Sequence, residues 1–233
     1  MLGPRRDLDG ALRKCPLFAR VDDETLTLCA GLLHLRRYRK GETIFHQGDA
    51  GDALFVIESG AVKIVLPSAG GEEEAIIATL GPGDFFGELA LLDGADRSAT
   101  AIAHGPTTAY RLGRADFERL MDTRPELRVA LLAALVAELR RLTQHVDELH
   151  FLNLPGRLAR RIVGLAREAD GSAAGEVRLP WPFSQSELAA MIGATRPTVN
   201  RLLAGFAAEG LLRVERDVLV VPDLERLDRV AER

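Results

Sequence analysis

Residues 85–100 of the chain read FFGELALLDGADRSAT, between segments whose composition predicts β-strands. Gly87 lets the backbone approach a neighbouring group closely, because glycine has no Cβ atom. Glu88 offers a carboxylate acceptor, and the four residues from Leu89 can form a short helical turn whose amides face outward. Nine residues after Glu88, the guanidinium of Arg97 and the hydroxyl of Ser98 can converge on the same place. The stretch therefore predicts a site for an anion linked to a sugar, since arginine and free amides suit the anion and a carboxylate suits sugar hydroxyls.

A simpler interpretation of the same residues stays open. Glu88 and Arg97 can form an ion pair on the surface of a sandwich, with no ligand between them. The spacing of the two residues is compatible with both interpretations.

Short runs rich in valine, isoleucine, phenylalanine and threonine surround this stretch and predict strands. The runs are Thr43–His46, Ala53–Glu58, Ala61–Leu66, Glu74–Leu80, Ala99–Ala103 and Thr107–Leu112. Glycine-containing pairs such as Gly51-Asp52 and Gly70-Gly71 separate them and supply turn chemistry. We expect an antiparallel β jelly roll in residues 1–115, preceded by short helical segments.

A long helix is predicted to follow, over residues 116–152, because glycine disappears and the apolar period changes. Leucines and valines recur there at intervals of three and four residues, at Leu132, Leu135, Leu139, Leu142, Val146 and Leu149. Such a narrow stripe favours pairing with a second copy of the chain. The helix could instead pack on its own domain, so this alternative also stays open.

The last part, residues 153–233, contains a pattern typical of a winged helix-turn-helix. Ser184-Gln185-Ser186-Glu187 is a capping box, Gly193 can end the first helix, and Thr195 can begin a second one. The second helix of such a motif enters the major groove of DNA. Runs at Leu211–Val214 and Val218–Val221, joined by a turn at Glu215–Asp217, resemble a two-stranded wing. The residues expected to contact DNA are Ser184, Thr195, Arg196, Thr198, Asn200 and Arg201. A purely structural helical hairpin is the competing interpretation.

Composition narrows the class of protein. The 233 residues, of which 47% are hydrophobic and 27% charged, are sufficient for two folded domains and exclude a disordered or fibrous chain. Residues 1–153 hold 18 basic and 23 acidic side chains, and residues 154–233 hold 12 and 11, so the net charge of −4 does not exclude nucleic-acid binding by the second part. No basic leader precedes an apolar run, and no apolar stretch approaches the roughly 20 residues that a bilayer needs. We expect a cytoplasmic protein with no membrane partner.

The run GELALL followed by RSAT resembles the phosphate-binding cassette of cyclic-nucleotide-binding domains. The helix-turn-helix resembles that of the cyclic-AMP receptor protein / FNR family of bacterial transcription regulators, and FLNLPGR at residues 151–157 is similar to the hinge region of that family. The resemblance covers nearly the whole chain. It implies a homodimeric regulator that binds pseudo-palindromic double-stranded DNA, meets RNA polymerase, and is controlled by a cyclic nucleotide, with cyclic AMP as the first choice.

The resemblance also implies roles for single residues. Glu88 would hold the ribose 2′-hydroxyl, Arg97 and Ser98 would hold the cyclic phosphate, and the amides around Gly87 and Leu89 would complete the site. Family members that bind adenine use two adjacent polar residues on the dimer helix. The matching residues here are Leu142, which cannot form such a hydrogen bond, and Thr143, which would reach the ligand of the partner subunit.

The recognition helix departs from the family pattern as well. Arg196 and Arg201 match two arginines of the best-known member, but Pro197 stands where that member has a glutamate. Because the carboxylate that would accept from cytosine is absent, we expect a different DNA half-site.

Other chemistries find little support in the residues. An iron–sulfur cluster normally needs four thiolates, and the chain has only Cys15 and Cys29. The five histidines show no pattern of haem or metal ligands, and no nucleophile with a base stands out, so we expect no metal, no haem and no catalysis. A regulator of the same family that needs no ligand, or that senses a different small effector, remains the alternative function.

Overall fold

The computed structural model describes residues 8, 10–67, 74–169, 175–180, 183–216 and 218–232. The predicted turn at Gly70-Gly71, residues 170–174 and the wing-turn residue Asp217 lie outside this set. The chain forms two compact units, Met1–Leu139 and Arg140–Arg233.

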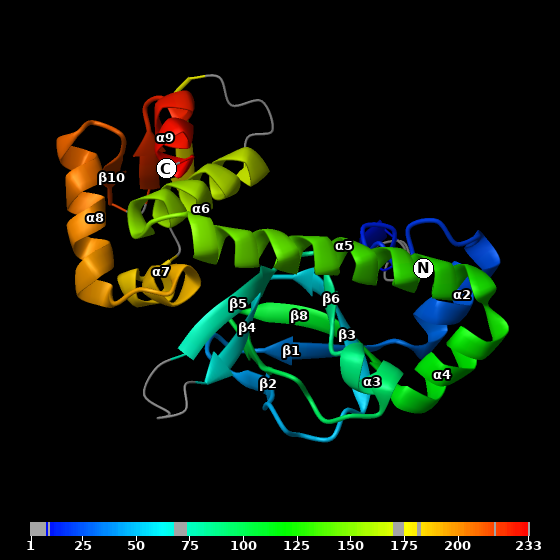
Figure 1. The fold of residues 1–233 in the computed structure, drawn as a ribbon. Coiled ribbons are helices and arrows are strands. Elements are labelled where there is room, and N and C mark those ends of the chain that lie inside the picture. The colour runs from blue at the N-terminus through cyan, green and yellow to red at the C-terminus, as the bar shows by residue number, and fades with distance from the viewer. Residues whose placement is uncertain are drawn as a thin grey trace. The chain divides into compact units, whose positions relative to one another are not determined.

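The first unit contains the predicted antiparallel jelly roll (Figure 1). One sheet has the order β1-β8-β3-β6 and the other the order β2-β7-β4-β5, and all strand pairs are antiparallel. The strands are β1 (His34–Tyr38), β2 (Thr43–Phe45), β3 (Ala53–Ser59), β4 (Val62–Pro67), β5 (Glu74–Leu80), β6 (Phe85–Phe86), β7 (Thr100–Ala103) and β8 (Thr107–Gly113). The mixed α and β fold class is confirmed.

Two of these strands were not among the predicted runs. β1 has the sequence HLRRY, and its first four residues are all exposed, so it lacks the alternation of apolar and polar residues that marks a half-buried strand. Pairing with β8, in which His34 lies opposite Arg111, holds β1 in place. β6 is only two residues long and is defined by its pairing with Phe55 and Val56 of β3. Both strands depend on tertiary contacts that local sequence does not reveal.

Helices complete the core of this unit. They are α2 (Asp23–Leu32), α3 (Leu89–Asp93) and α4 (Arg114–Thr123), and Asp22 caps α2 by accepting from the amide of Thr25. One buried cluster joins Leu91 of α3, Phe117 and Leu120 of α4, and residues of β3 and β8. The short helix α3 ends at Gly94, which has a φ of 72°. The cassette residues are thus attached to the same core as α4.

The predicted long helix is in fact two helices. α4 ends at Thr123, and α5 runs from Pro125 to Phe151. Arg124, between them, has φ −126° and ψ 86°, outside the helical region. A proline disfavours helical backbone in the residue before it but is tolerated in a first helical turn, so Pro125 ends one helix and begins the next.

The apolar stripe on α5 is also shifted from the predicted positions. Leu127 and Leu131 are buried in the core of the first unit, and Leu135 packs against it. Leu142 is 40% exposed, and the side chain of Leu149 is not among those described. Of the described large apolar residues before Phe151, those more than half exposed on α5 are Val129, Leu132, Val136, Leu139 and Val146, so three predicted positions are retained. Thr143 occupies the position that continues their three-four spacing. We call these six residues the α5 row. One face of the first part of α5 therefore packs on the first unit, and a different face of the helix carries the exposed row.

The second unit contains the predicted winged helix-turn-helix. Its helices are α6 (Leu154–Ala169), α7 (Gln185–Ile192), α8 (Arg196–Ala208) and α9 (Leu224–Ala231). Its strands are β9 (Val177–Pro180), β10 (Arg213–Glu215) and β11 (Val218–Val221), in the order β10-β11-β9. β9 and α9 were not predicted, and β9 turns the expected two-stranded wing into a three-stranded sheet. α9 buries Leu224, Leu227 and Ala231.

Candidate functional sites

Gly87 lies between β6 and α3 with a φ of 85°, a conformation that favours glycine. A Cβ atom at this position would lie 2.7 Å from Nη1 of Arg97 and 3.1 Å from the carbonyl oxygen of Ala53. The close approach that the sequence indicated is therefore to the side chain of Arg97. Glycine is required here whether or not a ligand binds.

Arg97 is buried, with only 2% of its side chain exposed. Its Nη1 donates to the carbonyl of Gly87 at 2.7 Å, and its Nη2 donates to the carbonyl of Ala53 at 2.8 Å. The guanidinium carbon also lies 4.2 Å from the centre of the Phe45 ring, at the distance of a cation–π contact. The Nε atom is buried and has no hydrogen-bond partner among the described residues.

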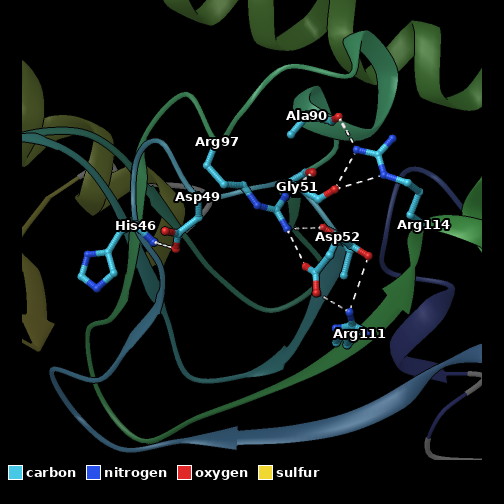
Figure 2. A network of polar contacts seen from close by, with 10 residues as sticks. His46, Asp49, Gly51, Asp52, Ala90, Arg97, Arg111 and Arg114 are labelled. Carbon is cyan, nitrogen blue, oxygen red and sulfur yellow. Dashed lines mark hydrogen bonds and ion pairs between the residues drawn. The ribbon is translucent and has the colours of Figure 1, made fainter.

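The carboxylate that pairs with Arg97 is that of Asp52, at 3.2 Å between Oδ1 and Nη2 (Figure 2). Oδ2 of Asp52 pairs with Nη2 of Arg111 at 2.6 Å. Within the described part of the chain Glu88 and Arg97 form no ion pair. The alternative interpretation of the cassette, a Glu88–Arg97 ion pair, is therefore wrong, because the partner of Arg97 is Asp52. Burial lowers the pKa of Arg97, and the charge of Asp52 opposes this shift.

Glu88 is half-buried immediately before α3, and burial raises the pKa of its carboxyl group. The neighbouring carboxylate of Glu138 raises it further, whereas a backbone hydrogen bond and the charge of Arg97 lower it. Leu89 and Ser98 are exposed. The carbonyl of Glu88 accepts from the amides of Leu91 and Leu92, both at 3.0 Å, so the turn itself uses these two amides.

The cassette thus presents a buried arginine with an unused Nε, a half-buried carboxylate and an exposed hydroxyl. These groups fit a phosphate attached to a sugar, because the arginine complements the anion and the carboxylate can accept from a hydroxyl. Thr143, the remaining predicted ligand residue, is exposed on α5 and belongs to the second unit.

Sequence reasoning missed Asp52 and the two further arginines near it, Arg111 and Arg114. Arg114 donates to the carbonyls of Gly51 and Ala90 (Figure 2). Gly51-Asp52 has the composition of an ordinary turn, and only the fold brings it to the cassette. The available sequence signal was the position of Asp52, an aspartate in a turn directly before a predicted strand.

In the second unit the capping box has the predicted geometry. The amide of Glu187 donates to Oγ of Ser184 at 3.2 Å, and the amide of Ser184 donates to Oε2 of Glu187 at 2.9 Å. Gly193 ends α7 with a φ of 66°, and Thr195 is the N-cap residue of α8. Arg157 of the hinge segment, which had no predicted role, donates from Nη1 to the carbonyl of Ile192 at 2.9 Å and so attaches α6 to the end of α7.

α8 has its apolar residues on a buried face and polar residues on an exposed face, as a recognition helix requires. Val199 and Phe206 are buried, whereas Arg196, Asn200 and Arg201 are exposed. Thr198 is half-buried, and its hydroxyl lies 3.0 Å from that of Thr195. An exposed arginine can pair with guanine and an exposed asparagine with adenine, so this helix offers a surface for base contacts.

The wing sheet carries a closed set of four charges, which we call the wing ring. Arg178 of β9 and Arg213 of β10 both lie opposite Val220 of β11. Each arginine pairs with both Glu176 and Glu215, at N–O distances between 2.6 and 3.2 Å. These pairs lower the pKa values of the two glutamates, with Arg213 as the leading cause.

Cys15 and Cys29 are free and buried, and burial raises the pKa of Cys15 to about 12 and that of Cys29 to about 11.

Within the described ranges no three histidine, cysteine, aspartate or glutamate side chains gather as metal ligands would. A shallow hollow of about 740 Å³ is lined by residues 37–42. None of the described helices combines the length and apolar character needed to cross a bilayer.

Comparison with protein-family models gives two matches. Residues 35–124 match the cyclic nucleotide-binding domain, and residues 156–230 match the Crp-like helix-turn-helix domain. The first match contains the cassette, and the second contains α7, α8 and the wing.

Three known proteins illustrate the similarity. The CRP-like cAMP-activated global transcriptional regulator of Mycobacterium tuberculosis is 33% identical over 224 residues, which are 96% of this chain and 100% of that protein. The cyclic AMP receptor protein of Thermus thermophilus is 34% identical over 220 residues, which are 94% of this chain and 98% of the relative. The solved structure of the c-di-GMP responsive global regulator CLP of Xanthomonas campestris has a TM-score of 0.76 at 24% identity, covering 86% of this chain and 99% of that one.

Proposed function

Because the chain belongs to the CRP/FNR family of transcription regulators, we propose that it is a homodimer whose affinity for DNA is controlled by a cyclic nucleotide in the jelly roll. It is a member of a family of DNA-binding regulators and not of enzymes. The further assignments are a jelly roll in residues 1–115, a dimerisation part in residues 116–152, and a DNA-binding part in residues 153–233. We expect the protein to act in the cytoplasm together with RNA polymerase.

The observation that carries the effector site is the buried guanidinium of Arg97, whose Nε has no partner among the described residues. A buried donor without a partner costs free energy, so a group that accepts from it would be favoured. In our proposal Arg97 and the exposed hydroxyl of Ser98 hold the phosphate. Glu88 accepts from the ribose 2′-hydroxyl, and the backbone at Gly87 and Leu89 completes the contact.

Cyclic AMP is the effector that we propose first, because the relatives in Mycobacterium tuberculosis and Thermus thermophilus are named for it. The Xanthomonas campestris protein of similar fold is described as responsive to c-di-GMP, a different cyclic nucleotide. The adenine end is the less specific part of this site. Thr143 is the polar residue that we assign to it, across the dimer, and the adjacent Leu142 offers no hydrogen bond.

The DNA contacts are assigned to α8 and its N-terminus. Arg196, Asn200 and Arg201 would contact base edges, and Ser184, Thr195 and Thr198 would contact the backbone near the starts of α7 and α8. The α5 row would pair with the same row of a second copy, because exposed leucines and valines at heptad spacing gain free energy by burial against each other. Two recognition helices of such a dimer can enter successive major grooves, about 34 Å apart.

A titration of the purified dimer tests the effector. Thermal unfolding is followed with cyclic AMP, cyclic GMP and c-di-GMP, and DNA binding is measured by fluorescence anisotropy with and without each nucleotide. A ligand at 100 times its dissociation constant stabilises the native state by about 2.7 kcal/mol. We expect this with cyclic AMP, and Arg97→Ala should abolish it. If none of the three nucleotides raises the unfolding temperature at millimolar concentration, the effector proposal is rejected.

One observation favours a second candidate, a regulator of this family that needs no nucleotide. Asp52 already supplies a negative charge to Arg97, and two backbone carbonyls accept from the same guanidinium. In that case tight and specific DNA binding occurs without any added nucleotide and does not change when nucleotide is present.

A further inference from the structure

Arg114, the first residue of α4, holds together two parts of the first unit that are distant in sequence. Its Nη2 donates to the carbonyl of Gly51 at 2.7 Å and to the carbonyl of Ala90 at 2.9 Å, and its Nε donates to Gly51 at 3.1 Å. The carbonyl of Ala90 belongs to α3, the helix of the cassette (Figure 2). One guanidinium thus connects the turn before β3, the cassette helix and the start of α4.

The backbone around this guanidinium is packed without spare room. A Cβ atom at Gly51 would lie 2.3 Å from Cβ of Ala90, so the turn lies directly against the cassette helix. Ala90 is 2% exposed. The backbone amide of Arg114 also donates to the carbonyl of Asp52 at 2.9 Å, and Asp52 is the residue whose carboxylate pairs with Arg97. A shift of α3 or of Asp52 therefore changes the contacts of Arg114 directly.

From Arg114 the connection to α5 is short. Phe117 and Leu120 of α4 lie in one buried cluster with Leu91 of α3 and with Leu127 and Leu131 of α5. The amide of Leu127 donates to the carbonyl of Arg124, which ties the first turn of α5 to the end of α4. α4 and the buried start of α5 are thus held to each other by a core that includes the cassette helix.

We propose that Arg114 is a positioning residue. Through its hydrogen bonds, a shift of the cassette on nucleotide binding moves α4 and α5, and this movement couples nucleotide binding to DNA binding. This inference rests on the proposed function. Arg114 contacts neither the phosphate nor the sugar in this assignment, and it acts through the carbonyls of Gly51 and Ala90. A planar guanidinium can donate to both carbonyls at once, which the single ammonium of a lysine or the amide of a glutamine does less well.

The experiment compares the wild type with Arg114→Gln and with Arg119→Gln as a matched control. Arg119 is on the same helix and is 60% exposed at its side chain, and its ion-pair partner among the described residues is the nearby Asp116, at 2.7 Å. Three dissociation constants are measured for each protein: that of cyclic AMP without DNA, that of DNA with cyclic AMP, and that of DNA without cyclic AMP. The ratio of the two DNA constants is the coupling factor, which is typically about 5–150 for allosteric proteins. Thermal unfolding without ligand shows whether each variant is folded, and Arg114→Lys serves if Arg114→Gln is not.

We expect Arg114→Gln to bind cyclic AMP within about threefold of the wild type but to have a coupling factor within about threefold of one. Arg119→Gln should retain the wild-type factor. Hydrogen exchange provides a readout that loss of stability alone would not produce. In the wild type cyclic AMP should slow exchange in residues 85–98 and in residues 114–135, and in the variant only in the first of these segments.

A folded Arg114 variant with an unchanged coupling factor and an unchanged exchange pattern overturns the inference and leaves the proposed function intact. A wild type whose DNA affinity does not respond to cyclic AMP, cyclic GMP or c-di-GMP overturns the proposed function, and the inference with it. The response of wild-type DNA affinity to nucleotide distinguishes the two failures.

Discussion

Asp52, and not Glu88, is the carboxylate that pairs with Arg97, at 3.2 Å between Oδ1 and Nη2. The same carboxylate pairs with Arg111, so one negative charge is shared between two arginines. Asp52 is 68% exposed at its side chain, whereas Arg97 is 2% exposed. A phosphate that approaches Arg97 must therefore compete with a solvated carboxylate for a buried cation.

Asp52→Asn should increase the affinity for cyclic AMP about three- to fivefold, because it removes a negative charge that opposes the phosphate, an effect worth about 1 kcal/mol or less at an exposed site. It should also lower the free energy of unfolding slightly, since Arg97 and Arg111 lose a partner. Isothermal titration calorimetry and urea unfolding measure the two effects. Asp96→Asn is the control, because Asp96 precedes Arg97 in the sequence but is not its partner. Equal gains in both variants would attribute the effect to net charge alone.

Glu88 should make cyclic AMP binding depend on pH. Burial raises the pKa of its carboxyl group above its usual range, and the carboxylate of Glu138 adds to the rise. In the proposed site the ionised form accepts from the ribose hydroxyl, so affinity should fall as the pH is lowered through the raised pKa. Calorimetric titrations across the acidic range should show this loss in the wild type, and Glu88→Gln should bind weakly at every pH.

The same group also affects stability, with the opposite sign. The folded protein holds the Glu88 proton more tightly than the unfolded chain does, so protonation favours the folded state. The stabilisation from Glu88 is fully present below its unfolded pKa and is lost as the pH rises through the raised folded value. Glu88→Gln should remove this part of the pH dependence of the unfolding free energy. A variant whose stability profile parallels that of the wild type throughout would contradict the prediction.

Leu132→Glu should weaken the homodimer more than tenfold, which corresponds to about 1.4 kcal/mol or more, because each dimer would bury two unpaired carboxylates. Light scattering across a dilution series measures the monomer fraction. Ala137→Glu is the control, since Ala137 is exposed on the same helix but is not part of the α5 row. Equal dimer dissociation constants in the two variants would show that the α5 row is not the interface.

Arg196→Ala should weaken binding to the cognate operator by about 1–3 kcal/mol and bring it closer to binding of a shuffled sequence. The reason is that an exposed arginine on α8 is placed to pair with a base edge. Arg229→Ala, at an exposed position of α9, removes the same charge and should change both affinities little. Competition binding with the two DNAs gives the specificity ratio. An equal loss on both DNAs would assign Arg196 to phosphate contacts.

The elements best predicted from sequence are those that carry their own local signals. The capping box at Ser184, the glycine at position 193 and the isoleucine-containing strand Glu74–Leu80 each have a short-range physical cause, and each occurs where it was predicted. β1 and β9 lack such causes, because a run of exposed basic residues or a proline-flanked segment becomes a strand only when a partner strand lies beside it.

The shifted apolar row on α5 and the identity of the partner of Arg97 have a common explanation. A heptad pattern indicates that a stripe exists, but Leu135 and Val136 are adjacent and both apolar, and only the core around Leu127 decides which one is covered. Similarly, Glu88 and Asp52 are both carboxylates within reach of a jelly-roll arginine. The pairing of β3 with β6, together with the turn before β3, decides between them.

The two thiols of the first unit have a practical consequence. With pKa values of about 12 and 11, Cys15 and Cys29 are almost entirely protonated at neutral pH, and both are packed inside the core. Oxidants react with the thiolate form, so neither sulfur is a good target for peroxide or for disulfide exchange. The purified protein should keep its DNA-binding properties after exposure to air, without added reducing agent.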